Sequence, residues 1–370
     1  MGCCEVISQK SPGAVPEPEA SVSNKAQDRH RSSTGATWNR RTALKSLLGS
    51  AGVVAAGSCG ESHQNGAIRV RLAFCGQLLC VVPYEVARVG GHFASQGLDV
   101  ELVYTRGGSA AMQALIGGAV DYAGTSLDVA LQAAANGASI RRIASTGRLP
   151  LFALAVAPTQ TSNILGVKDL EARTVGISGL GNADHALLLF LLDQAGADAD
   201  RVDFATIGTN LFDALRIGQV DAGMLQEPAL SLITEAGGRE LVNFMELRQA
   251  HNHLGGTYEF MGVSVRNAER NRRLNEIQRL AAGLEGGLAD TRRLPPSDIV
   301  AALPEALVAG SNLGQLERIL DRYRLSLYPE SVGIDIGAAE RVVRAQEIAG
   351  LLSPEEINLE SLLDTKAVAG

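Results

Sequence analysis

A repeated alternation of strand-like and helix-like stretches constrains the fold of this chain more than any other feature. Between residues 68 and 145, four short stretches of strand type alternate with three stretches of helix type, and the connections between them are short. Such a pattern places successive strands parallel in one sheet and packs the helices on its faces. The sequence therefore predicts an α/β fold built on a parallel sheet covered by helices.

The same alternation returns after residue 150. Strands are expected at 152–157, 174–177, 202–207, 222–225, 241–244 and 260–265, and helices at 183–195, 211–217 and 229–236. From Arg266 onward the pattern is helical, with a break at Pro295 and Pro296. At about 150 residues per domain, a chain of 370 residues is long enough for two domains. Two independent domains and two lobes joined by crossing strands both fit this pattern.

The first 58 residues differ from the rest in charge and composition. They carry seven basic and four acidic side chains, whereas the whole chain has a net charge of −7. Residues 1–37 are rich in Ser, Pro, Ala and Gly without apolar periodicity, so we expect them to be disordered, or to precede the true start of translation. A basic leader on an acidic chain indicates a targeting segment.

The targeting segment resembles a twin-arginine export signal. Arg40 and Arg41 are followed by Lys45 and then by thirteen uncharged residues, a stretch too short to span a bilayer. Three small residues precede Cys59. We therefore expect export from the cytoplasm. Cys59 is either the first residue after ordinary cleavage or the lipidated cysteine of a lipoprotein.

The composition excludes several partners and cofactors. An acidic chain with a pI near 5.5 has no electrostatic attraction for nucleic acid. The spacing of the five cysteines and six histidines fits no metal or redox motif, so we expect no metal and no cofactor. Cys75 and Cys80 lie at a strand end and the following turn, where they form either a disulfide or two buried free thiols.

Three expected helices begin with Gly, Ser, Thr or Asn directly after a strand. Free backbone amides at a helix N-terminus bind anions, and the carboxyl ends of strands are where α/β proteins hold ligands. Helix capping alone also explains such residues, but three starts at one edge favour a ligand site. The candidate ligand-binding residues from these starts are Gly108, Ser109, Thr125, Ser126, Ser178, Gly181 and Asn182.

Five further polar residues near expected strand ends are weaker candidates. Arg148 offers two donors to an anion, although a solvated arginine fits equally well. His185 and Asn210 lie at helix starts, where packing and capping are the simpler roles. Gln226 and Glu227 follow a strand, and a carboxylate there would recognise an ammonium or a ring nitrogen. Glu227 is thus the one pointer to a zwitterionic or heterocyclic ligand.

Several segments together resemble the substrate-binding proteins of ABC importers, in the group that handles sulfonates, nitrate, taurine and thiamine-pyrimidine precursors. The resemblance covers about residues 67–366. It rests on the segments PYEVA (83–87), GHF (91–93), GLDVEL (97–102), GGS (107–109), ALIGGAVD (114–121), VKDL (167–170), TVGIS (174–178), ALRIGQVDA (214–222) and QEP (226–228), and on the tail 334–352 with Asp364.

The resemblance implies a type II periplasmic-binding-protein fold, in which two α/β lobes close on a ligand by hinge motion. Lobe 1 would comprise 67–150 and the return segment 261–366 with the C-terminal helices, and lobe 2 would comprise 151–260. The implied function is an extracytoplasmic receptor that captures a small polar organic solute, anionic or zwitterionic, and delivers it to an ABC permease and its ATPase. We expect a monomer at the outer face of the cytoplasmic membrane or in the periplasm.

Two other functions share this fold. A ligand-binding sensor is one, although the chain contains no DNA-recognition segment. An enzyme of pyrimidine-precursor synthesis is the other. The eukaryotic enzymes that resemble this family are thought to use pyridoxal phosphate, which needs a lysine imine. After residue 58 the chain has only Lys168 and Lys366, and neither follows a strand at the expected ligand edge. We therefore expect a binding protein rather than an enzyme.

Overall fold

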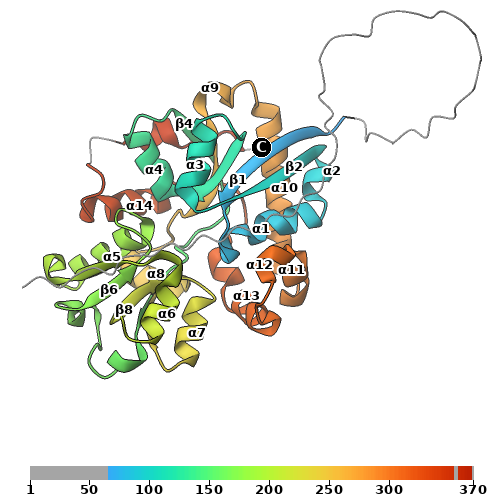
Figure 1. Ribbon diagram of the computed structural model, residues 1–370. Helices are drawn as coiled ribbons and strands as arrows, with labels where there is room; N and C mark the ends of the chain where they lie inside the picture. The colour runs from blue at the N-terminus through green and yellow to red at the C-terminus, as the bar shows by residue number, and fades with distance from the viewer. Residues whose placement is uncertain (1–65, 354–356, 369–370) are drawn as a thin grey trace, which may run out of the picture. The chain divides into compact units, whose positions relative to one another are not determined.

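The computed structural model describes residues 66–353 and 357–368. The expected leader, with its paired arginines and Cys59, lies outside these residues. The described residues belong to one compact unit. It contains two five-stranded sheets with helices around them, so the predicted α/β fold class is confirmed (Figure 1). None of the helices that the structure describes has the length and apolar character needed to cross a membrane.

The first sheet has the strand order β2-β1-β3-β10-β4. Its strands are β1 (Ile68–Cys75), β2 (Leu98–Thr105), β3 (Tyr122–Ser126), β4 (Ile140–Ser145) and β10 (Met261–Arg266). The helices between them are α1 (Leu78–Val89), α2 (His92–Ser95), α3 (Gly108–Ile116) and α4 (Leu127–Ala135). The sequence predicts a single helix over 79–94, but Gly91 adopts a left-handed conformation with φ of 72° and divides it.

The second sheet has the order β7-β6-β8-β5-β9. Its strands are β5 (Ala153–Val156), β6 (Thr174–Ile177), β7 (Asp203–Thr206), β8 (Ala222–Leu225) and β9 (Arg239–Asn243). Around them lie the helices α5 (Ala183–Gln194), α6 (Leu211–Arg216), α7 (Ala229–Glu235) and α8 (Leu247–Leu254), with short 3₁₀ turns η1 (Pro158–Gln160), η2 (Val167–Leu170), η3 (Ala199–Arg201) and η4 (Gly208–Asn210). The central strands β5 and β8 are buried along their whole length.

Neither sheet is purely parallel, which corrects the sequence-based expectation. β10 runs antiparallel to both β3 and β4, and β5 runs antiparallel to both β8 and β9. The chain enters each of these strands from the other sheet rather than through a strand–helix–strand crossover. The handed crossover that makes successive strands parallel does not apply to them. The other strands pair in parallel, as the alternation predicts.

The helical tail follows β10. It consists of α9 (Asn267–Arg270), α10 (Leu274–Arg293), α11 (Pro296–Ala302), α12 (Glu305–Val308), α13 (Leu313–Leu327), α14 (Ile336–Ile348) and α15 (Leu359–Leu362). The predicted break lies between α10 and α11, at Pro295. α10 packs along α1, and α14 contacts both α4 and α5. The last part of the chain therefore connects elements of both sheets.

Candidate functional site

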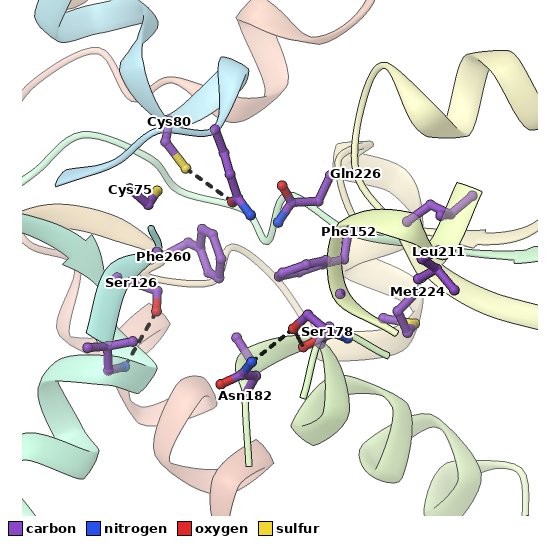
Figure 2. A pocket seen from close by; sticks show the side chains of 18 of the residues that line it. Cys75, Cys80, Ser126, Phe152, Ser178, Asn182, Leu211, Met224, Gln226 and Phe260 are labelled. Atoms are coloured by element: carbon purple, nitrogen blue, oxygen red, sulfur yellow. Dashed lines mark hydrogen bonds between the residues drawn. The ribbon is translucent and has the colours of Figure 1, made fainter. Parts of the chain in front are cut away.

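A cavity of about 620 Å³ opens where the two sheets face each other (Figure 2). Its walls come from the carboxyl ends of β1, β3, β6 and β8, from the helix starts that follow them, and from the two segments that cross between the sheets. This is the edge at which α/β folds hold ligands. The cavity is large enough for a small organic molecule.

The starts of α3, α4 and α5 all line this one cavity, as the sequence analysis expected. Gly108, Ser109, Ser126, Ser178 and Asn182 are among the lining residues. The dipoles of the three helices place partial positive charge at the cavity. At the start of α4, the amides of Leu127 and Val129 already donate to the Phe260 carbonyl at 2.7 Å and to Ser126 Oγ at 3.4 Å. The structure thus brings together five of the seven helix-start candidates.

The start of α3 carries two glycines, so its backbone is not covered by side chains at these positions. Gly107 has φ of 114°, which side chains other than glycine rarely adopt. A Cβ at Gly108 would lie 3.3 Å from Cγ2 of Val129 in α4, so the two helix starts pack tightly. At the start of α4, Ser126 caps the helix, and its Oγ accepts a hydrogen bond from the amide of Val129 at 3.4 Å. Both helix starts are therefore fixed before any ligand arrives.

The start of α5 is held by a buried carboxylate. Asp184 is fully buried and accepts hydrogen bonds from the amide of Ser178 at 2.6 Å and from its hydroxyl at 2.7 Å. Asn182 Nδ2 donates to Ser178 Oγ at 3.0 Å. Burial raises the pKa of Asp184, and the bonds from Ser178 oppose that rise. Since the Ser178 hydroxyl already donates to Asp184, it positions the loop rather than offering a proton to an anion.

Arg106 supplies the full positive charge at the cavity, and the sequence analysis missed it. It lies in the loop between β2 and α3, its side chain is exposed, and it lines the cavity. Its guanidinium makes no hydrogen bond or ion pair with any residue of the described ranges. The residue directly precedes the Gly107–Gly108–Ser109 segment, and that position was the signal that could have revealed it.

An aromatic and apolar wall faces these polar groups. The rings of Phe152 and Phe260 lie perpendicular to each other with their centroids 6.1 Å apart. Figure 2 shows both rings in the middle of the cavity, between the cysteines and Ser178. Leu211 and Met224 extend the apolar surface from the second sheet. The sequence analysis did not select these residues, although Phe152 and Phe260 begin the two expected crossing strands.

Part of the chain matches a known family model. Residues 81–255 match the family model described as NMT1/THI5 like. No curated protein matches the chain in sequence.

Solved structures are similar to a larger part of the chain. A protein from Bordetella bronchiseptica RB50 has a TM-score of 0.70 at 23% identity and covers 81% of this chain and 95% of its own. The periplasmic aliphatic sulphonate-binding protein SsuA from Escherichia coli has 0.60 at 21%, covering 76% and 91%. The periplasmic nitrate-binding protein NrtA from Synechocystis PCC 6803 has 0.62 at 11%, covering 81% and 86%. The chain therefore has the periplasmic-binding-protein fold, as the resemblance implied.

Two candidates from the first sheet and its neighbourhood do not line the cavity. Thr125 is buried within β3, where its carbonyl accepts a hydrogen bond from Arg142 at 2.8 Å, and its hydroxyl has no partner among the described residues. Arg148 turns away because its guanidinium donates to the carbonyls of Leu325 at 2.6 Å and Ser326 at 2.9 Å. Arg148 thus ties the crossing segment to the end of α13.

Three candidates near the second sheet also do not line the cavity. His185 accepts a hydrogen bond from the amide of Gly181 at 3.1 Å, and burial lowers the pKa of its imidazole. The Gly181 carbonyl accepts from Gln132 of α4 at 2.6 Å, which links the start of α5 to the first sheet. Asn210 is exposed before α6 and makes no side-chain cap. His185 and Gly181 therefore form hydrogen bonds within the protein, and Asn210 faces solvent.

Gln226 and Glu227 do line the cavity, after β8. The Glu227 carboxylate accepts hydrogen bonds from the amide of Ser231 at 3.0 Å and from its hydroxyl at 3.1 Å. Burial raises the pKa of Glu227, and these two bonds oppose that rise. The carboxylate therefore stabilises the first turn of α7 while its side chain borders the ligand space.

Cys75 and Cys80 are free, buried cysteines on the cavity wall, so the structure contains the two thiols rather than the disulfide. Cys80 Sγ lies 3.9 Å from Gln77 Oε1 and 3.8 Å from Met261 Sδ. The contact with Cys80 lowers the pKa of Cys75, and the same contact, together with burial, raises the pKa of Cys80. One wall of the cavity therefore carries three neighbouring sulfur atoms.

A buried ionic network of Arg142, Glu259 and Asp128 lies next to Phe260 of the cavity wall. Arg142 is fully buried and donates to the carbonyls of Thr125 at 2.8 Å and Phe260 at 2.9 Å. Its guanidinium lies 3.5 Å from Glu259. Burial raises the pKa of Glu259 to about 7 and that of nearby Asp128 to about 6, despite the positive charge of Arg142. The network holds the end of β3 and the start of β10 in place.

Proposed function

We propose that this protein is an extracytoplasmic receptor that captures a small organic anion and presents it to an ABC importer. One observation carries the proposal. Arg106 and the starts of α3, α4 and α5 border the same cavity of about 620 Å³ in a chain with the periplasmic-binding-protein fold. Three helix dipoles and one uncompensated guanidinium favour a negative ligand group over a neutral or positive one.

The ligand should also carry an apolar part. Phe152, Phe260 and Met224 also line the cavity and give it an apolar surface. Burial of apolar ligand surface against such side chains adds affinity that a simple inorganic anion cannot gain. Glu227 leaves room for a zwitterion, because an ammonium or a ring nitrogen beside its carboxylate would gain a charge-assisted hydrogen bond. An organic anion with an apolar body, with or without a cationic group, therefore fits best.

Delivery would follow from lobe closure. A ligand held between Ser109 of the first sheet's side and Asn182 of the second favours the closed form, and only that preference shifts the balance between open and closed forms. The permease and ATPase of an importer would respond to the closed form. The twin-arginine-like leader supports a location outside the cytoplasm, free or tethered through Cys59, and a monomer suffices for this mechanism.

The enzymatic alternative lacks support from the cavity. Lys168 and Lys366 are the lysines of the described ranges, both are exposed, and neither lines the cavity. A pyridoxal imine would need a lysine there. A ligand-binding sensor would use the same cavity. A transport receptor differs from a sensor in that it interacts with a permease.

The test is identification of the bound solute followed by calorimetry. Native mass spectrometry of the purified chain should reveal an organic anion, and ethanesulfonate, MOPS and nitrate serve as titrants alongside it. Arg106→Ala should weaken binding of the best titrant about 10–100-fold, since a hydrogen bond to a charged group contributes about 1.5–3 kcal/mol. Arg148→Ala is the matched control and should bind normally. Equal affinity of Arg106→Ala and the unmodified chain would refute the proposed anion site.

A further inference from the structure

Three sulfur atoms from separate elements meet on one wall of the cavity. Cys75 ends β1, Cys80 lies in the first turn of α1, and Met261 begins β10. All three side chains are at least nine-tenths buried, with exposures of 6%, 2% and 4%, yet all three line the cavity. Figure 2 shows Cys75 and Cys80 side by side above Phe260. The cluster is thus shielded from bulk water but open to whatever enters the cavity.

The spacing of the sulfur atoms suits a shared metal ion. Cys80 Sγ and Met261 Sδ are 3.8 Å apart. Metal–sulfur bonds of about 2.3 Å in a trigonal plane hold the sulfurs about 4 Å apart. Cys75 lies next to Cys80 on the same wall of the cavity (Figure 2), so the third sulfur is close to the second. An ion could therefore bind with small side-chain rotations.

We propose that Cys75, Cys80 and Met261 form a binding site for a monovalent copper ion on the cavity wall. Thiolate and thioether are soft ligands, and copper(I) accepts both in a trigonal arrangement. Zinc prefers four ligands drawn from Cys, His, Asp and Glu. In the part of the chain that the structure describes, no three such residues lie close enough together to hold a metal. A third ligand of thioether type therefore selects copper(I).

Binding would be an exchange of protons for the metal. Each thiol releases its proton to solvent as its sulfur bonds to copper, and the copper enters already in the monovalent state, so no oxidant or reductant takes part. Two thiolates and one copper(I) ion leave a net charge of −1 on a desolvated wall. The site's three ligands are not among the groups proposed to bind the solute, although Met261 pairs with Ser126 across β10 and β3. The site therefore does not depend on the solute-binding function proposed above.

The experiment uses the full chain with Cys3, Cys4 and Cys59 replaced by serine, so that Cys75 and Cys80 are the remaining thiols. The reduced protein is titrated with copper(I) without oxygen, in competition with bicinchoninate. One ion should bind per chain. Cys75→Ser and Cys80→Ser should each abolish that binding. Circular dichroism and thermal unfolding of each variant show whether it is folded.

Two methionine variants test the third ligand without disturbing the thiols. Met261→Leu should weaken copper affinity at least about tenfold, since loss of even an outer partner of a metal typically costs about 10–100-fold. Met224 lines the same cavity from β8, and the Met224→Leu variant should bind copper normally. The proposal is overturned by a folded chain that binds no copper, by binding that survives Cys75→Ser, or by equal affinities of Met261→Leu and Met224→Leu.

Discussion

Replacement of Glu259 by Gln tests how the buried network beneath the cavity contributes to stability. The 3.5 Å separation of Arg142 and Glu259 suggests a stabilising ion pair whose loss would cost about 3–5 kcal/mol. The raised pKa of Glu259 argues the opposite, because a carboxyl with a pKa of about 7 is held more favourably when it is neutral. We follow the second argument, since both groups are fully buried and desolvation exceeds their attraction.

The sign and the size follow from linkage. The ordinary pKa of 4.5 applies in the unfolded chain, and a value of about 7 applies in the folded one. Folding therefore takes up a proton between these values, and the contribution of Glu259 to stability is present below pH 4.5 and is lost as the pH rises to 7. Between pH 5.5 and pH 8 this loss amounts to about 2 kcal/mol. A glutamine side chain does not ionise, so the Glu259→Gln variant does not lose this stability as the pH rises.

The assay is urea unfolding of the unmodified chain and Glu259→Gln at pH 5.5 and pH 8. The free energy of unfolding of Glu259→Gln, relative to the unmodified chain, should rise by about 2 kcal/mol from the lower to the higher pH. Glu330→Gln removes an exposed ion pair with Arg292 and should show little change at either pH. If Glu259→Gln instead becomes relatively less stable at pH 8, the ion pair is net stabilising and the reasoning fails.

Four further predictions concern the cavity and the leader. Ser126→Ala should weaken solute binding measured by calorimetry. Ser178→Ala should lower the melting temperature, because Asp184 loses its hydroxyl donor, and an unchanged melting temperature contradicts that role. Glu227→Gln should weaken binding of a zwitterionic titrant and strengthen binding of a pure anion. If the variant changes neither affinity, the carboxylate does not contact the ligand. Conversion of Arg40 and Arg41 to Lys should retain precursor in the cytoplasm on cell fractionation, and normal export would exclude the twin-arginine route.

Much of the architecture could be read from the order of residues along the chain. The strands β6 and β8 and the helices α5, α6 and α7 lie within a residue or two of their predicted bounds, because hydrophobic period and breaking residues act over a few positions. The same local rules located the polar helix starts. Ser126 and Asn182 were recognisable because a helix start after a strand has a local signature and always lies at the carboxyl edge of the sheet.

Tertiary structure decided what local patterns do not contain. The antiparallel directions of β5 and β10 depend on which sheet the chain enters, and the sulfur cluster joins residues as far apart as Cys75 and Met261. Arg148 donates to carbonyls at the distant end of α13, and His185 accepts from nearby Gly181, whereas Arg106 lines the cavity. Periodicity specifies which face of an element is buried, but the partner that buries it comes from a distant part of the chain. The cavity is made from such partners, so its charge and its apolar wall emerge only when both sheets are packed.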